Sequence, residues 1–120
     1  MTHSNGKRAL VVTVDKRWRD HCVNTLINAG CEVDTASKAA AAFDLCQKVP
    51  FDLVLLDDSL PDYGPIETVL TVRDVAQHDP ALFVGGDKMD RFHRFWERTH
   101  VTFAGEKGQI PGQVMSALGQ

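Results

Sequence analysis

The segment FDLVLLDDSLPDYGP, residues 51–65, brings two carboxylates to the end of an apolar run. Residues 53–56 are all apolar and lead directly into Asp57 and Asp58, and a turn rich in proline and glycine follows. A carboxylate that ends a buried strand can accept a phosphoryl group, bind a metal ion, or be only the polar end of the strand. The choice depends on the partners that the rest of the chain supplies.

Two other charged residues are candidates for such partners. Asp15 follows the first apolar run and is followed by two basic residues, so we interpret it as a helix N-cap, with metal ligation as the alternative. Lys107 is interpreted either as an ordinary loop lysine or as a charge that reaches back to Asp57. Asp58 is interpreted as a solvated neighbour of Asp57.

Other polar motifs in the chain are weak. The pair Gly85-Gly86 lacks the rest of a P-loop or dinucleotide-binding pattern. The histidines are scattered, and none is paired with a cysteine or another histidine at the spacing of a zinc site. Cys22, Cys31 and Cys46 are interpreted as reduced and mostly buried thiols.

The elements that position these residues alternate regularly between strands and helices. Apolar runs predict strands at residues 9–14, 32–35, 53–56, 82–84 and 101–104. Amphipathic segments between the runs predict helices, and Ser37 is expected to cap the second of them. This alternation predicts an α/β fold with a five-stranded parallel sheet in the order 2-1-3-4-5 and helices on both faces. Ligand sites in such sheets lie at the carboxyl ends of the strands, where Asp57 is expected.

Composition limits the class of protein. A chain of 120 residues with 43% hydrophobic residues predicts one domain, 1–120, with a disordered start at 1–7. The net charge of −3 gives no overall basic field, so nucleic acid is expected as a partner only if an output domain is fused. No apolar run approaches the roughly 20 residues of a membrane span, and no signal sequence is visible at the start, so we expect a cytoplasmic protein.

Several short motifs occur along the chain in an order and spacing that are informative when taken together. They are LVLLD followed by Pro61, the spacing of Arg19, Leu26 and Gly30, the pair Thr35-Ala36, and Ala41. In this order the chain resembles the receiver domain of two-component response regulators over nearly its whole length. The resemblance implies the flavodoxin-like three-layer fold of receivers, and it implies that Asp57 is the phosphoacceptor.

The resemblance also locates departures from the receiver pattern. The two adjacent acids that end the first strand in receivers fall on Thr13 and Val14, and the Ser or Thr that ends the fourth strand falls on Gly85. The Lys-Pro pair that ends the fifth strand falls on Gly105 and Glu106. The remaining candidates for a Mg²⁺ shell are Asp15, Asp57 and the backbone carbonyl of Ser59. We therefore expect weak Mg²⁺ binding and no other cofactor.

A basic and aromatic segment, residues 87–100, is the candidate interaction surface. Not all aromatic side chains of a fourth helix in this segment can face the sheet, so Phe95 is expected at the margin and partly exposed, with Arg91 and Arg98 around it. By resemblance, this region of receivers forms a signalling and dimerisation face. The expected partners are therefore a sensor kinase or a downstream effector, or a second copy of the chain in a homodimer through the fourth helix.

Three functions remain open from the sequence. The first is a divergent receiver that acts as a protein-interaction module, is not an enzyme, and is phosphorylated weakly or not at all. The second is an active phosphoacceptor at Asp57 with a rebuilt Mg²⁺ site. The third is a small flavodoxin-like ligand-binding domain or enzyme that uses the glycine pair, which a cleft beside Gly85 would favour.

Overall fold

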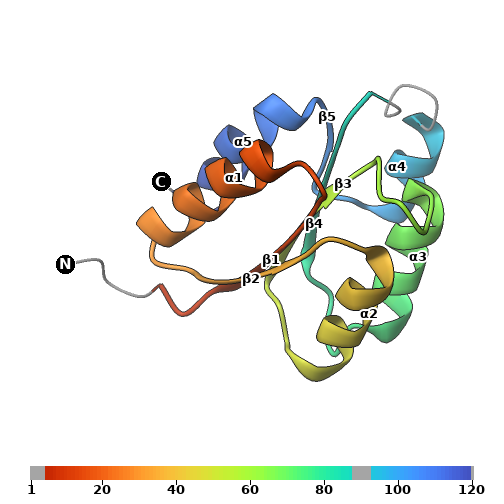
Figure 1. The fold of residues 1–120 in the computed structure, drawn as a ribbon, viewed down its shortest axis with the longest axis horizontal. Helices are drawn as coiled ribbons and strands as arrows, with labels where there is room; N and C mark the ends of the chain where they lie inside the picture. The colour runs from red at the N-terminus through yellow and green to blue at the C-terminus, as the bar shows by residue number, and fades with distance from the viewer. Residues whose placement is uncertain (1–4, 88–92, 120) are drawn as a thin grey trace.

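The computed structural model describes residues 5–87 and 93–119. Strands and helices alternate along this part of the chain (Figure 1). The strands are β1 (Arg8–Val12), β2 (Glu32–Ala36), β3 (Leu53–Asp57), β4 (Ala81–Gly85) and β5 (Phe103–Gly105). The helices are α1 (Lys16–Asn28), α2 (Ala39–Lys48), α3 (Pro65–Val75), α4 (His93–Thr99) and α5 (Ile110–Ala117), with a short 3₁₀ helix, η2 (Lys107–Gln109), before α5.

The sheet has the predicted topology. It contains five strands in the order β2-β1-β3-β4-β5, and every neighbouring pair is parallel. Asp57 is in register with Gly85, and Gly85 is in register with Gly105, so the ends of β3, β4 and β5 meet at one edge. The α/β class and the strand order are therefore confirmed.

Helices cover both faces of the sheet and form two apolar cores. Figure 1 shows α1 and α5 on one face and α2, α3 and α4 on the other. Because successive side chains of a strand point to opposite faces, Leu10 and Val12 pack toward the second group of helices while Ala9 and Val11 pack toward the first. Strand β3 is buried on both faces, which explains its continuous apolar run up to Asp57.

The helix starts near the site are fixed by two aspartates. Asp15 is the N-cap of α1, and its carboxylate accepts a hydrogen bond from the Trp18 N–H at 3.1 Å, as the N-cap interpretation predicts. The expectation for Ser37 is wrong, because α2 begins after Lys38 without a local side-chain cap. Asp62, from the loop after β3, instead accepts hydrogen bonds from the first two N–H groups of α2, at 2.9 and 3.0 Å.

The start of the described chain is attached to the end of α1. The Asn5 N–H donates to the Gly30 carbonyl at 3.0 Å, and the Asn5 side-chain amide donates to the Ala29 carbonyl at 2.9 Å. Residues 5–7 are therefore held by hydrogen bonds, although the segment 1–7 was expected to be disordered; residues 1–4 lie outside the described part. None of the helices described is long and apolar enough to cross a membrane.

Candidate functional site

Asp57 lies at the carboxyl edge of the sheet and is nearly fully buried, with 3% of its surface exposed. Its Oδ2 accepts a hydrogen bond from the Thr13 hydroxyl at 2.6 Å and one from the Lys107 ammonium at 3.2 Å. Its Oδ1 accepts a hydrogen bond from the Ser59 N–H at 2.9 Å. A carboxylate oxygen has about two lone-pair positions, so the donors on Oδ2 occupy both. One position on Oδ1 remains.

Lys107 joins the two candidate acids. Its ammonium lies 3.2 Å from Asp57 Oδ2 and 3.0 Å from Asp15 Oδ2, and 28% of its side chain is exposed. Burial alone would lower the Lys107 pKa, but hydrogen bonds and attraction from Asp15 and Asp57 outweigh it and raise the pKa above its usual value. The hydrogen bond from the Trp18 N–H, followed by the one from Lys107, lowers the Asp15 pKa. Lys107 therefore stays charged, and Asp15 stays ionised to lower pH than a free aspartate does.

The approach of Lys107 depends on glycine at position 85. A Cβ atom placed on Gly85 would lie 2.5 Å from Ile110 Cδ1 and 3.0 Å from Lys107 Cα. The chain after β5 thus occupies the space that a side chain at the end of β4 would need. Trp18 holds this chain from the other side, because its indole N–H donates to the Lys107 carbonyl at 2.9 Å. The Lys107 ammonium also lies 5.5 Å from the centre of the Trp18 ring, within range of a cation–π interaction.

Asp58 is buried, so its interpretation as a solvated neighbour is wrong. Only 2% of its surface is exposed, and its Oδ1 accepts a hydrogen bond from the Ser59 hydroxyl at 3.0 Å. The Asp58 carboxylate fills the space where a Cβ atom on Gly86 would lie. Protein atoms therefore occupy the volume beside both glycines of the pair Gly85-Gly86. This geometry argues against a ligand cleft at the glycine pair.

The two carboxylates predicted to bind Mg²⁺ have other partners in this structure. Asp15 and Asp57 both contact the same ammonium, and the Thr13 hydroxyl uses its hydrogen to bind Asp57. The Ser59 N–H donates to Asp57 Oδ1, and the role of the Ser59 carbonyl as a Mg²⁺ ligand stays a prediction. Within the described residues there is no group of three or more His, Cys, Asp or Glu side chains that could hold a metal ion. Val14, the other residue at the position of the acid pair, is apolar and 58% exposed.

The predicted interaction surface is only partly described. Arg91 lies outside the described residues. Phe95 is half-buried, packs against the core under α4, and contacts the Trp96 ring edge-on with a centroid distance of 4.9 Å. Arg98 is exposed on the same helix. The position of Phe95 at the margin of the core agrees with the helical spacing, and its role in binding stays a prediction.

Several solved structures similar to this chain are described as receiver domains or response regulators. A CheY-like response regulator receiver domain protein from Methanospirillum hungatei is 19% identical, with a TM-score of 0.76 and coverage of 94% of both chains. The chemotaxis response regulator CheY4 of Vibrio cholerae is 23% identical, with a TM-score of 0.79 and coverage of 94% of this chain and 96% of that one. The sequence matches no protein-family model and no curated protein.

A third similar structure was determined with a metal ion. The receiver domain of the histidine kinase CKI1 from Arabidopsis thaliana, complexed with Mg²⁺, is 19% identical, with a TM-score of 0.77 and coverage of 95% of this chain and 93% of that one. At such low identity the likeness establishes the fold alone. This chain has the fold of a receiver domain, and its carboxyl edge carries an ammonium bound by two aspartates.

Sequence reasoning missed three residues of the site. Thr13 was considered only as a lost acid, yet its hydroxyl makes the 2.6 Å hydrogen bond to Asp57 and also accepts the Asp15 N–H at 3.0 Å. The polar N–H of Trp18, which donates to the Lys107 carbonyl, was not considered. Asp62 was treated as a turn residue, although its carboxylate caps α2. A buried Trp usually finds a partner for its N–H, which was the available signal for Trp18.

Proposed function

We propose that this chain is a receiver-like signal-transduction domain that acts by binding a protein partner, with slow or absent phosphorylation of Asp57. The contact of Lys107 with both Asp15 and Asp57 carries this proposal. A carboxylate that accepts a phosphoryl group needs a free lone pair, and the transfer needs cationic groups close to the oxygens of the incoming phosphoryl group. Here the available ammonium already neutralises the acceptor, and the carboxylate keeps only one free lone-pair position, on Oδ1.

Mg²⁺ competes poorly with this arrangement. The ion prefers hard oxygen ligands in a nearly octahedral shell, with several of its waters retained. To bind it, Asp15 and Asp57 would have to release Lys107, and the ammonium would have to move from a partly buried position with two hydrogen bonds. Binding would therefore require the loss of an existing ion bridge, so the expected affinity is millimolar or weaker.

The proposed partner is a protein, either a sensor kinase or a downstream effector, and the chain is not expected to be an enzyme. The half-buried Phe95 and the exposed Arg98 on α4 support a contact surface, because aromatic and arginine side chains are common anchors of interfaces. A homodimer through the same helix is the alternative use of this surface. A cytoplasmic location is part of the proposal.

Labelling with a small phosphodonor tests the proposal. The chain is incubated with acetyl phosphate, with and without Mg²⁺, and aspartyl phosphate is measured by intact-mass spectrometry. We expect little or no labelling of the wild-type chain under either condition. Lys107→Met removes the competing ammonium but also removes a charge that assists transfer, so it should raise Mg²⁺ affinity without giving rapid labelling. Lys48→Met, which changes a lysine at the far end of α2, is the matched control and should change neither.

The second function, an active phosphoacceptor with a rebuilt metal site, predicts the opposite. Rapid Mg²⁺-dependent labelling of the wild-type chain that Asp57→Asn abolishes would refute our proposal in favour of it. Thr13→Asp together with Val14→Asp restores the two acids and should raise Mg²⁺ affinity measured by titration calorimetry. Failure of this double variant to gain affinity, in a folded protein, would show that Thr13 and Val14 do not occupy the positions of the two acids.

A further inference from the structure

A hollow beside the Asp57 site has the character of an anion site. Its volume is about 340 Å³, and it lies at the carboxyl ends of β1 and β2, next to the start of α2. It is lined by Thr13, Arg19, Thr35, Ala36, Ser37 and Ala41. Small-molecule sites usually measure about 300–1,000 Å³, so this hollow can hold only a small ligand. Open α/β sheets bind ligands at this edge.

The polar groups that line the hollow are mainly unused donors. Within the described part of the chain, the hydroxyls of Thr35 and Ser37 have no hydrogen-bond partner. Among the described residues, the Arg19 guanidinium is hydrogen-bonded to Asp20 alone, with Nε and Nη2 at 3.3 and 3.2 Å from the same carboxylate oxygen. Asp20 is exposed and adjacent in sequence, and exposed pairs of this kind contribute little. Most of the N–H groups of Arg19 are therefore available to a ligand.

The charge of the lining selects the kind of ligand. Among the residues that the structure describes, Arg19 is the only charged side chain that lines the hollow, and no carboxylate lines it. Ala36 and Ala41 leave room beside the guanidinium because their side chains are single methyl groups. A guanidinium presents parallel N–H groups that match the oxygens of a phosphate, and free hydroxyls can donate to its remaining oxygens.

We propose that this hollow binds a small phosphate-bearing molecule through Arg19, Thr35 and Ser37. The inference does not rest on the function proposed for Asp57, because none of these three side chains contacts Asp57. Thr13 connects the two places, since it lines the hollow and its hydroxyl donates to Asp57. That hydroxyl is already used, so Thr13 forms a wall of the site and does not bind the phosphate.

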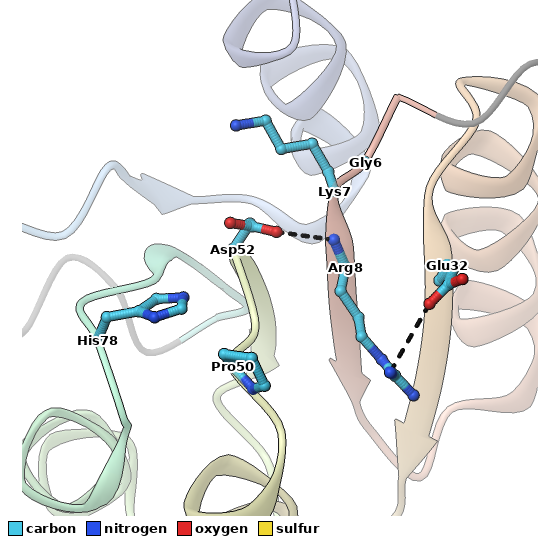
Figure 2. Close-up of a pocket in the computed structure, with 7 residues that line it drawn as sticks. All are labelled: Gly6, Lys7, Arg8, Glu32, Pro50, Asp52 and His78. Carbon is cyan, nitrogen blue, oxygen red and sulfur yellow. Dashed lines mark hydrogen bonds and ion pairs between the residues drawn. The ribbon is translucent and has the colours of Figure 1, made fainter.

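A second hollow at the opposite edge of the sheet is a poorer anion site. It measures about 380 Å³ and is lined by residues that include Lys7, Arg8, Glu32, Asp52 and His78. Figure 2 shows its two carboxylates, with Asp52 bonded to the Arg8 N–H and Glu32 paired with the Arg8 guanidinium. These carboxylates would repel an anion. The hollow at Arg19 is therefore the favoured phosphate site.

The test titrates inorganic phosphate into the full chain at constant ionic strength and follows backbone amide shifts by NMR. We expect saturable shifts at residues 35–37 and near Arg19. Arg19→Gln should weaken binding about tenfold or more, because hydrogen bonds to charged groups are the strong ones. Arg17→Gln removes the same charge from an exposed position on the same helix, outside the lining, and should retain the wild-type affinity.

Two further variants keep the test decisive. Thr35→Val at an exposed strand position should weaken phosphate binding while the protein stays folded. Asp57→Asn should leave phosphate binding unchanged or slightly tighter, which separates this site from the chemistry of Asp57. Absence of saturable shifts in the wild-type chain, or equal affinities for wild type and Arg19→Gln, would overturn the proposal. Sulfate binding with the same dependence on Arg19 would support a general oxyanion site, whereas shifts reproduced by chloride alone would refute it.

Discussion

Replacing Gly85 with alanine tests how the carboxyl edge of the sheet is packed. The new Cβ atom would lie 2.5 Å from Ile110 Cδ1, 3.0 Å from Lys107 Cα and 3.2 Å from Lys107 Cγ. Ile110 is completely buried, so its side chain can move only by disturbing the core between α5 and the sheet. The contact with Lys107 involves the backbone, which cannot be relieved by a change of rotamer.

The expected loss of stability combines two opposing effects. Overpacking a core typically costs about 1–3 kcal/mol. Replacing glycine with alanine also lowers the conformational entropy of the unfolded chain, which stabilises the folded protein by about 0.4–1 kcal/mol. We therefore expect Gly85→Ala to lower the free energy of unfolding by about 1–2 kcal/mol. For a domain of this size that corresponds to a decrease in melting temperature of roughly 4–8 °C.

Urea denaturation and thermal unfolding measure this change directly. Gly112→Ala is the matched control, because Gly112 lies in α5 and a Cβ atom there would meet no atom within 4 Å. This control should raise stability by about 0.5–1 kcal/mol, as expected for glycine to alanine in a helix. Adding Lys107→Met should cost less in the Gly85→Ala background than in wild type, because the methyl group already displaces Lys107. Equal stability of wild type and Gly85→Ala would refute the close packing on which this reasoning depends.

Three further predictions concern the same framework. Lys107→Met should lower the free energy of unfolding by about 2–3 kcal/mol near neutral pH, because it leaves the buried Asp57 without its cation. Because the Lys107 pKa is raised, the difference from wild type should shrink above about pH 10.4, and because the Asp15 pKa is lowered, it should also shrink below about pH 3.9. Urea denaturation across this pH range measures the difference. Phe95→Ala should cost about 1–2 kcal/mol, since the ring is half-buried against Trp96; a loss above about 3 kcal/mol with unchanged self-association in sedimentation would place it in the core and not on an interface. Burial raises the pKa of the Cys22 thiol to about 12, so native protein should react with a thiol reagent far more slowly than unfolded protein; rapid reaction of the native chain would contradict the packing of α1.

The sequence was sufficient for the fold because the signal for each element repeats over many residues. The apolar run at Leu53–Asp57 is buried on both faces, and this is the pattern of a central parallel strand. The position of Asp57 at the carboxyl edge then followed from the strand order alone. Thr13 and Gly85 also lie at this edge, since the Thr13 hydroxyl donates to Asp57 and Gly85 is in register with Asp57.

The detailed contacts of the site could not be predicted from the sequence. Whether Lys107 reaches Asp57 depends on the path of the chain after β5, and that path depends on empty space at Gly85. Burial of Asp58 depends in the same way on the space beside Gly86. When one part of the chain fits into the space left by a glycine elsewhere, the local sequence around either part shows no pattern that would reveal it. Asp62 was missed because it caps a helix that precedes it by more than 20 residues in the chain.

The ion bridge made by Lys107 also has a consequence for the order of folding. Lys107 is separated from Asp15 by 92 positions and from Asp57 by 50, so both contacts close long loops of chain. Long-range contacts of this kind form late, after local structure has lowered the entropy of closure. Because Asp57 precedes Lys107 by 50 positions, it leaves the ribosome well before Lys107 during synthesis. Until residue 107 and the buried Ile110 arrive, β3 ends in an uncompensated carboxylate, and the nascent sheet cannot complete its core.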